Sequence, residues 1–251
     1  MLNEIEILSF KLSTFNLMMS LGLLSALLAL LAECKKNKLN AVDETKVITA
    51  FPFGFLFGAF FAHIIDVYFH EGFFACFSAS VFKYGITFLG SLIGGILYLF
   101  LHAKITKLSY LYLLNFYLPL YALAQGFGRI GCFLGGCCFG KPCEAFGLSY
   151  PEKSLPFCVY ESAKLFPIQL IESCYLFIIF FSIIKVVNFN KRAATYLILM
   201  SIGRFIFEFA RGDDRGTIWS NTISPSQFLC VCLFLVGIFI KERIGIKANS
   251  T

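Results

Sequence analysis

The amino-acid sequence predicts an all-α polytopic membrane protein with about seven transmembrane helices. Its 251 residues are 58% hydrophobic and only 14% charged, and the mean hydropathy is +0.78. A soluble domain carries about 25% charged residues, so this chain is too apolar for a soluble, disordered or secreted class. Its apolar residues also fall in unbroken runs of about 20, the length that a helix needs to cross a bilayer.

Each apolar run is expected to form one transmembrane helix, in chain order. The runs cover 13–33, 47–69, 81–102, 108–127, 167–188, 193–211 and 222–240. We interpret the chain as a single transmembrane domain, 1–251, whose longest interruption is the segment 128–166. Long segments without a helical pattern are usually functional, so this one is a candidate for part of a site.

Basic residues gather in alternate loops between these runs. Twelve of the 21 Lys and Arg residues follow the first, third, fifth and seventh runs: Lys35, Lys36, Lys38, Lys46, Lys104, Lys107, Lys185, Lys191, Arg192, Lys241, Arg243 and Lys247. Short loops rich in Lys and Arg stay in the cytoplasm. We therefore expect the N-terminus and the 128–166 segment outside and the C-terminus in the cytoplasm. The net charge of +6 reflects this topology and does not indicate nucleic-acid binding.

Three charged residues near the end of the sixth run are unusual at membrane depth. Glu208 and Arg211 follow Arg204 by four and seven residues, which places all three on one face of a helix. A charged side chain inside a bilayer costs about 2.5–3.5 kcal/mol on insertion scales, so it indicates function. Glu208 can neutralise one arginine, which leaves the other to bind an anion. A buried ion pair, with one arginine reaching the interface, is the structural alternative.

Glycines surround Arg129 at the end of the fourth run, and they include Gly128, Gly131 and Gly140. Glycine lets the backbone come close to a ligand or to a neighbouring helix. Exposed amides beside a guanidinium group would form a phosphate cradle. Plain helix packing is the alternative for the same glycines.

Two further pairs share a helix face. Gln169 and Glu172 stand three residues apart behind Pro167 at the start of the fifth run. By themselves they are typical of a helix cap or an interfacial anchor. Gly90 and Gly94 in the third run form a small-xxx-small pattern, which is typical of close helix packing.

Cysteines are concentrated in the outer segment, which contains Cys132, Cys137, Cys138 and Cys143. Their spacing differs from the two-residue intervals of zinc sites, so we expect no metal and no cofactor. A disulfide is permitted outside the membrane, but the spacing selects no pairing.

In the order in which they occur, these motifs resemble those of the bacterial phosphatidylglycerol–prolipoprotein diacylglyceryl transferase family. The resemblance is carried by Gly90-Ser91-Leu-Ile-Gly94-Gly95, Gly128-Arg129-Ile-Gly131, Gly140, Pro167-Ile-Gln169-Leu-Ile-Glu172, Arg204-Phe-Ile-Phe-Glu208-Phe-Ala-Arg211 and Ser226-Gln227. It covers most of the chain from the second apolar run onward. Seven transmembrane helices with an outside N-terminus are also the architecture of that family.

The resemblance implies a multi-pass transferase of the bacterial cytoplasmic membrane that works without a cofactor. It would move the diacylglyceryl group of phosphatidylglycerol to the lipobox cysteine thiol of a preprolipoprotein and release glycerol phosphate. Such an enzyme must bind the anionic headgroup, stabilise the leaving charge and help remove the thiol proton. By resemblance, Arg129 and Arg204 bind the phosphate, while Glu208 and Arg211 orient and neutralise them. The other matched positions are assigned to substrate binding: Gly90, Gly94, Gly128, Gly131, Gly140, Gln169 and Glu172.

The chain departs from the family pattern where a proton acceptor is expected. Leu89 stands where the family commonly has His or Tyr, and Phe166 replaces a frequent His. Cys132 occupies a usual Asn position, and Cys137 a usual acidic one. Tyr84, Glu208 or Cys137 could take over the proton, and the sequence does not choose among them.

Two other functions remain open at the level of sequence. A divergent membrane protein of the same fold could catalyse a different lipid-transfer reaction or only bind phospholipid. A small transporter or channel is less favoured, because a conduction path needs polar residues in several helices and the first, third and seventh runs have almost none.

Overall fold

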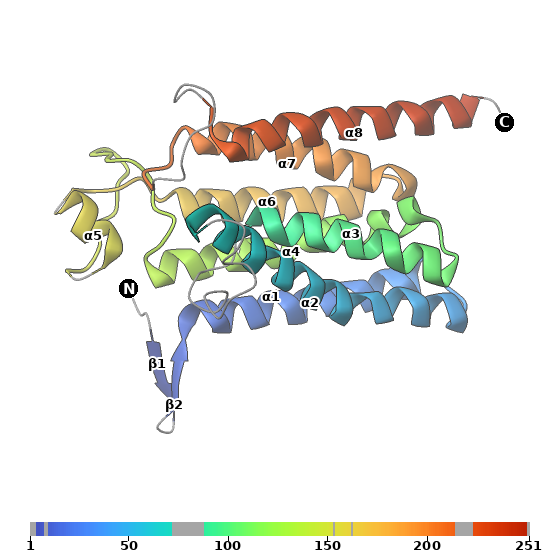
Figure 1. Cartoon of the computed structure of the whole chain (residues 1–251), viewed down its shortest axis with the longest axis horizontal. Coiled ribbons are helices and arrows are strands. Elements are labelled where there is room, and N and C mark those ends of the chain that lie inside the picture. The colour runs from blue at the N-terminus through green and yellow to red at the C-terminus, as the bar shows by residue number, and fades with distance from the viewer. Residues whose placement is uncertain are drawn as a thin grey trace. The chain divides into compact units, whose positions relative to one another are not determined.

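The computed structural model of the chain describes residues 4–7, 10–71, 88–152, 154–161, 163–213 and 223–249. Within this part, each of the seven apolar runs corresponds to a helix, as predicted. These helices are α1 (Thr14–Lys36), α2 (Ala41–Glu71), α3 (Phe88–Thr106), α4 (Tyr110–Gly135), α6 (Ile168–Val186), α7 (Arg192–Glu208) and α8 (Pro225–Asn249) (Figure 1). A short helix, α5 (Leu155–Tyr160), lies in the 128–166 segment, and the 3-10 helix η3 (Phe189–Lys191) precedes α7.

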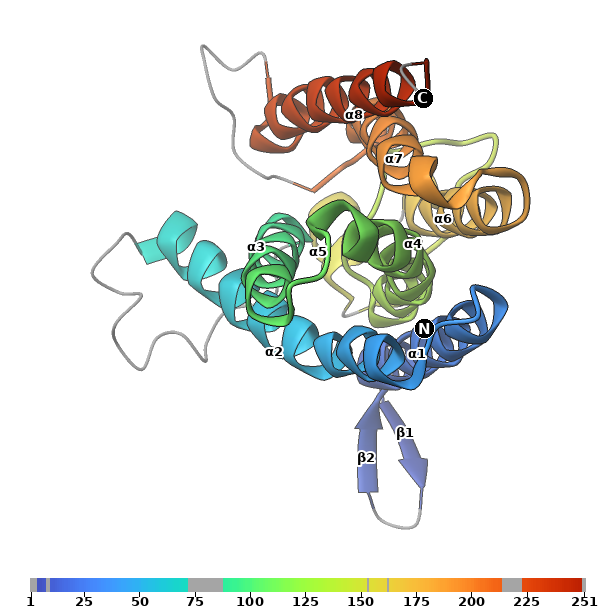
Figure 2. The same cartoon turned by 90° about the vertical axis from the view of Figure 1, so that its right-hand side faces the viewer.

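A β-hairpin before α1 departs from the expected all-α class. Strand β1 (Glu4–Ile7) pairs antiparallel with β2 (Phe10–Ser13), with Glu4 opposite Ser13 and Ile7 opposite Phe10. In Figure 2 the hairpin extends from the start of α1. The sequence here alternates apolar with polar or charged residues, which is the period of a strand. An alternation of only four residues per strand is a weak signal beside the long apolar runs, so the hairpin was not predicted.

Three of the described helices are long and apolar enough to cross a membrane by length and composition. They are α1, the Ala41–Ile65 part of α2, and α6, while Gly90–Thr106 in α3 is a shorter apolar helix. Helix α7 has only 17 residues, and α4 includes Pro119 and the charged Arg129. This composition is that of a membrane protein.

The chain divides into two compact units. One comprises 1–29 with 117–251, and the other comprises 30–116. In the 30–116 unit, α2 and α3 pack closely because Gly90 and Gly94 have no side chain. A Cβ atom on Gly90 would lie 2.5 Å from the Ala62 Cα, and one on Gly94 would lie 2.9 Å from the Phe57 carbonyl oxygen. The packing predicted for this small-xxx-small pattern is confirmed.

The unit formed by 1–29 and 117–251 contains all the charged residues of the candidate site. Helices α6, α7 and α8 lie side by side in it (Figure 1; Figure 2). Helix α7 approaches α6 closely at Gly203, where a Cβ atom would overlap the Tyr175 ring. The Tyr175 hydroxyl donates to the Leu199 carbonyl oxygen at 2.7 Å and further joins the two helices.

Helix α4 continues beyond its predicted end and stops at a glycine in the left-handed conformation. Gly136 has φ 69°. Its amide donates to the Phe133 carbonyl oxygen at 3.2 Å, and the Cys137 amide donates to the Cys132 carbonyl oxygen at 3.0 Å. This pair of bonds is the Schellman arrangement, which closes a helix by turning the chain back over its last turn.

The chain between α4 and α6 folds into a small packed element. Leu165 forms isolated β-bridges with Pro142 and Leu148. Leu165 also packs with Phe139 and Tyr150 in a local hydrophobic cluster. This cluster fixes the path of the chain from the end of α4 to the start of α6.

Candidate functional site

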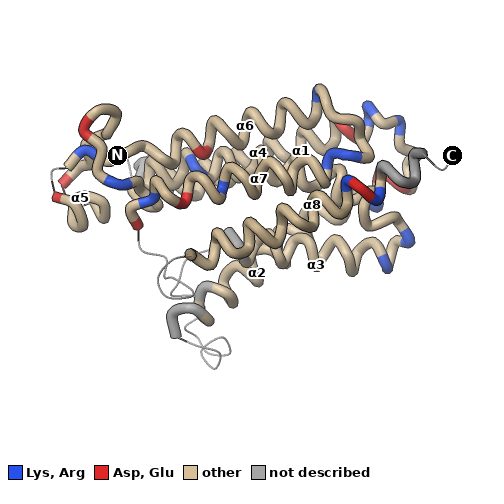
Figure 3. Tube along the Cα trace, turned by 90° about the horizontal axis from the view of Figure 1, so that it is seen from above, with Lys and Arg blue, Asp and Glu red and all other residues tan. Residues whose placement is uncertain are grey.

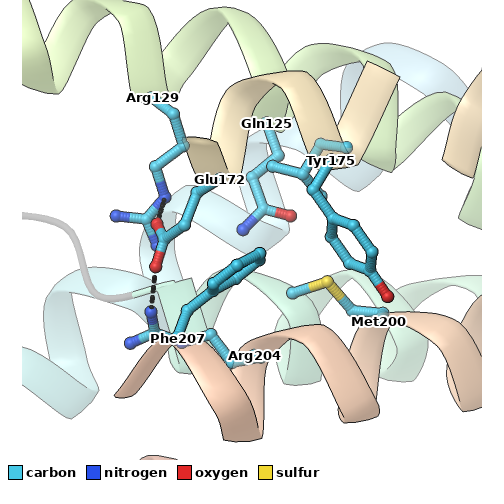
Figure 4. Close-up of a pocket in the computed structure, with 8 residues that line it drawn as sticks. Gln125, Arg129, Glu172, Tyr175, Met200, Arg204 and Phe207 are labelled. Carbon is cyan, nitrogen blue, oxygen red and sulfur yellow. Dashed lines mark hydrogen bonds and ion pairs between the residues drawn. The ribbon is translucent and has the colours of Figure 1, made fainter. Parts of the chain in front are cut away.

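One buried carboxylate, that of Glu172 in α6, is in contact with three arginines. Arg129 Nε in α4 lies 2.6 Å from Glu172 Oε2, and Arg204 Nη1 in α7 lies 2.8 Å from Glu172 Oε1. Arg211 Nη1, beyond the end of α7, lies 3.4 Å from the same Oε1 atom. Figure 4 shows the Arg129 and Arg204 side chains converging on Glu172 from two helices.

Two further acids complete the cluster. Glu208 Oε2 lies 2.9 Å from Arg204 Nη2, one helical turn away. Asp213 accepts two hydrogen bonds of 2.9 Å from Arg211, one from Nε and one from Nη2. Three guanidinium groups are thus matched by three carboxylates. Glu172 is only 3% exposed, and the arginines are 4–6% exposed. Charges this deeply buried persist only when they are paired, which the cluster achieves.

Arg211 reaches the cluster by a route that differs from the predicted one. The spacing in sequence predicts Arg204, Glu208 and Arg211 on one helix face, but α7 ends at Glu208. Arg211 instead forms an isolated β-bridge with Gly140. The Gly212 amide donates to the Phe139 carbonyl oxygen at 2.9 Å and secures this pairing. Long-range backbone pairing therefore positions the third arginine.

Gln169 and Glu172 do share a face of α6, as predicted, but neither caps the helix. Pro167 occupies the N-cap position and no side chain caps it. Gln169 is fully buried. Its Nε2 atom donates to the Cys137 carbonyl oxygen at 2.9 Å, and the Tyr150 hydroxyl donates to its Oε1 atom at 3.4 Å. Gln169 therefore joins α6 to the segment that follows α4.

A pocket lies beside the charge cluster, within the same unit. It is lined by Gln125, Arg129, Glu172, Tyr175, Leu176, Met200, Arg204 and Phe207 (Figure 4). The Gln125 Oε1 atom is buried and has no hydrogen-bond partner among the described residues. A buried acceptor without a partner costs about 1–3 kcal/mol, so this amide is suited to a ligand that enters the pocket.

The chain is similar to known proteins along nearly its whole length. The family model described as prolipoprotein diacylglyceryl transferase matches residues 3–241. The chain belongs to the prolipoprotein diacylglyceryl transferase family. A phosphatidylglycerol–prolipoprotein diacylglyceryl transferase of Clostridium tetani is 31% identical over 244 residues, 94% of each chain. A second relative, named transferase 2 of Clostridium perfringens, is 30% identical over 98% of this chain and 96% of its own.

Within this diacylglyceryl transferase, the glycines around Arg129 pack helices together. The glycine-rich segment around Arg129 was expected to expose backbone amides, but as far as Gly135 it is part of the continuous helix α4. A Cβ atom on Gly128 would lie 3.1 Å from Met19 Sδ, and one on Gly131 would lie 3.1 Å from the Phe15 ring. Both contacts are with α1. Glycine at these two positions lets α1 approach α4 closely.

Gly140 is constrained by the backbone on two sides. A Cβ atom there would overlap the Phe166 carbonyl oxygen and would lie 3.2 Å from the Ala210 carbonyl oxygen. Its bridge to Arg211 makes it a positioning residue for the charge cluster. Gly90 and Gly94 belong to the 30–116 unit, where they pack against α2.

Three cysteines meet beside the arginines of this family member. The Sγ atoms of Cys132, Cys137 and Cys138 all lie within 4.8 Å of one another, and none of the three is in a disulfide. Hydrogen bonds from the other two thiols lower the pKa of Cys138, and the charges of Arg129 and Arg211 lower it further against the opposing effect of burial.

The three candidate proton acceptors have different surroundings in the structure. Tyr84 lies outside the described residues, as does the side chain of Leu89. Glu208 is paired with Arg204 at 2.9 Å. Cys137 lies in the thiol cluster.

Sequence reasoning missed two residues of the site. Gln125 precedes Arg129 by one helical turn, so a polar residue four positions before the arginine was the available indication. Asp213 follows Arg211 by two positions. Asp213 lies beyond the helix expected through residue 211, so helical periodicity gave no indication of its contact with Arg211.

Proposed function

We propose that this protein transfers the diacylglyceryl group of phosphatidylglycerol to the lipobox cysteine thiol of a preprolipoprotein and releases glycerol phosphate. Family membership and the names of relatives that match nearly the whole chain support this activity. The observation that carries it is the convergence of Arg129, Arg204 and Arg211 on one buried carboxylate beside a pocket. Three guanidinium groups at one buried point form a site for a phosphodiester anion.

In this proposal the headgroup phosphate takes the place that Glu172 occupies among the arginines. Arg129 and Arg204 contact opposite oxygens of the Glu172 carboxylate. A phosphodiester also presents two oxygens in a fork, so it can receive the same donors. Glu208 and Asp213 keep Arg204 and Arg211 in place while Glu172 gives way.

The arginines then assist the chemistry as well as the binding. The acceptor thiolate attacks the glyceryl carbon, a C–S bond forms, and the C–O bond to phosphate breaks with its electron pair moving to the phosphate. The leaving phosphate gains negative charge in the transition state. Preorganised guanidinium groups stabilise that charge in a buried site more strongly than water does. The nucleophile belongs to the substrate, so no enzyme serine or cysteine has to be acylated.

We further propose seven membrane-spanning helices in one domain, with the N-terminus and the 128–166 segment outside and the C-terminus inside. The protein then resides in the bacterial cytoplasmic membrane, with the cluster on the outer side. Within the unit that contains α6 and α8, Lys and Arg occur at the end of α6 and at the end of α8 (Figure 3). In the 30–116 unit, His102 near the end of α3 hydrogen-bonds the Lys46 carbonyl oxygen at 2.8 Å, so two basic segments meet there. Both groupings support the positive-inside orientation.

The activity is tested by adding purified protein to phosphatidylglycerol vesicles with a peptide that carries a lipobox cysteine. We expect thioether-linked diacylglyceryl peptide by mass spectrometry and release of glycerol phosphate. Arg129→Ala should abolish both products. The matched control is Arg243→Ala, which removes an exposed arginine of α8. Absence of product with the unmodified protein, or full activity of Arg129→Ala, would contradict the proposal.

A further inference from the structure

Cys132, Cys137 and Cys138 have the geometry of three ligands to one metal ion. Their Sγ atoms lie within 4.8 Å of one another. Zinc–thiolate bonds are about 2.3 Å long, so the sulfurs of a tetrahedral site are about 3.8 Å apart. Small side-chain rotations therefore bring these sulfurs to the spacing that a bound ion requires.

The backbone explains how cysteines with an unusual spacing come together. The Schellman turn at Gly136 brings Cys137 back over Cys132, whose carbonyl oxygen accepts the Cys137 amide at 3.0 Å. Cys138 also has a left-handed backbone, with φ 58°. The Gln169 side chain holds the Cys137 carbonyl oxygen at 2.9 Å. The three thiols are thus fixed by a helix end, a tight turn and a buried amide.

Positively charged side chains lie close to these cysteines. Cys132 follows Arg129 by three residues on α4, so the two side chains share a helix face. Cysteine binds metal as the thiolate. Three thiolates around Zn²⁺ carry a net charge of −1, which the neighbouring arginines compensate. No carboxylate ligand is therefore needed to balance the charge of the ion.

We propose that Cys132, Cys137 and Cys138 bind a thiophilic d¹⁰ cation, Zn²⁺ or Cu⁺, and that its open coordination position takes the acceptor thiol of the lipobox peptide. The metal-binding part is independent of the reaction, whereas the role of the open position rests on the proposed function. Catalytic metal sites typically have three protein ligands and one open position. The trio provides that number of ligands.

This assignment accounts for the proton that leaves the acceptor thiol. A thiol that coordinates such a cation is deprotonated outright, and its proton passes to water. The sulfur then forms the C–S bond while the C–O bond breaks and its electron pair goes to the phosphate. The ion does not change its oxidation state. The thioether product is a weaker ligand than the thiolate, so it can leave the site.

Metal content is measured first, because it does not depend on transfer activity. The full chain is purified in detergent under reducing conditions, loaded with Zn²⁺ or Cu⁺ in separate samples, and analysed by elemental mass spectrometry. We expect about one ion per chain with at least one of the two metals. Cys132→Ser, Cys137→Ser and Cys138→Ser should each lose it. Cys158→Ser, which removes an exposed cysteine of the same segment, should retain it.

A chain that retains neither metal while transferring diacylglyceryl would overturn the inference and leave the proposed function intact. A stable disulfide among the three cysteines in the active enzyme, seen as a loss of two hydrogens in intact mass, would overturn it equally.

The open position is tested by spectroscopy of the Co²⁺-loaded chain, which needs no turnover. Addition of the lipobox peptide should strengthen the sulfur-to-metal charge-transfer absorption, because a further thiolate enters the coordination sphere. The same peptide with its cysteine replaced by serine should leave the spectrum unchanged. Identical spectra with both peptides would overturn the role of the open position. The Co²⁺ spectrum of the unmodified chain also decides the matter should the Ser variants fail to fold.

Discussion

Arg129 and Glu172 form the shortest ion pair among the described residues of the site, with Nε and Oε2 2.6 Å apart. They belong to different helices, α4 and α6, and both are almost fully buried. The pair neutralises the arginine when no anionic lipid is bound. An incoming phosphate therefore competes with a carboxylate of the protein itself, and Glu172 should govern both the stability of the empty site and its affinity for phosphatidylglycerol.

Glu172→Gln should make the protein less stable and more responsive to lipid. Removing one partner of a buried ion pair costs about 3–5 kcal/mol, and here it leaves three arginines with two acids. The phosphate of phosphatidylglycerol restores the missing charge. We therefore expect a lower Tm in neutral detergent, and a larger rise in Tm on adding phosphatidylglycerol than in the unmodified protein.

The control for this prediction is Glu242→Gln, which neutralises an exposed acid of α8. Its Tm and its response to phosphatidylglycerol should match those of the unmodified protein. An equal lipid-induced rise in Tm for Glu172→Gln and the unmodified protein would show that Glu172 does not compete with the headgroup.

Arg204→Lys should lower turnover although it preserves the charge. The two terminal nitrogens of Arg204 contact different acids, Glu172 at 2.8 Å and Glu208 at 2.9 Å. A lysine ammonium cannot reproduce this planar fork. Loss of one preorganised donor to a developing charge typically lowers kcat about 10²–10³-fold. Steady-state transfer to the lipobox peptide measures it, with Arg243→Lys as the control, and turnover within a factor of about two of normal would refute the role assigned to the fork.

The helices were predictable because a helix that crosses a membrane needs about 20 consecutive apolar residues. Unbroken apolar runs of bilayer length specify α1 and α6 almost to the residue. The hairpin of β1 and β2 was missed because its eight strand residues are a short alternating pattern beside long apolar ones. The end of α4 was placed too early, because the apolar run ends at 127 whereas the helix continues through glycines that allow α1 to approach.

The residues of the site were predictable from the sequence, but the contacts among them were not. A charged residue in an apolar helix is conspicuous, so Arg129, Arg204 and Glu172 could be identified from the sequence. Helical periodicity shows which residues share a face, but it does not show which face meets which. The central place of Glu172 therefore required the packing of α4 against α6 and α7. Arg211 required the bridge to Gly140, which joins positions 71 residues apart in sequence (211 − 140).

Gly140→Ala should disturb the site although residue 140 carries no charge. The new methyl group would overlap the Phe166 carbonyl oxygen, so the backbone must move and the pairing with Arg211 should weaken. Overpacking of this kind costs about 1–3 kcal/mol in stability. Displacement of Arg211 should raise the KM for phosphatidylglycerol by more than the accompanying loss of stability explains.

The matched control is Gly135→Ala, five residues earlier, where a Cβ atom meets nothing within 4 Å. At this helical position alanine should raise stability by about 0.5–1 kcal/mol and leave the KM unchanged. Thermal unfolding and lipid-dependent kinetics of the two variants separate the effects, because a structural role alone would lower the Tm of Gly140→Ala without changing its KM.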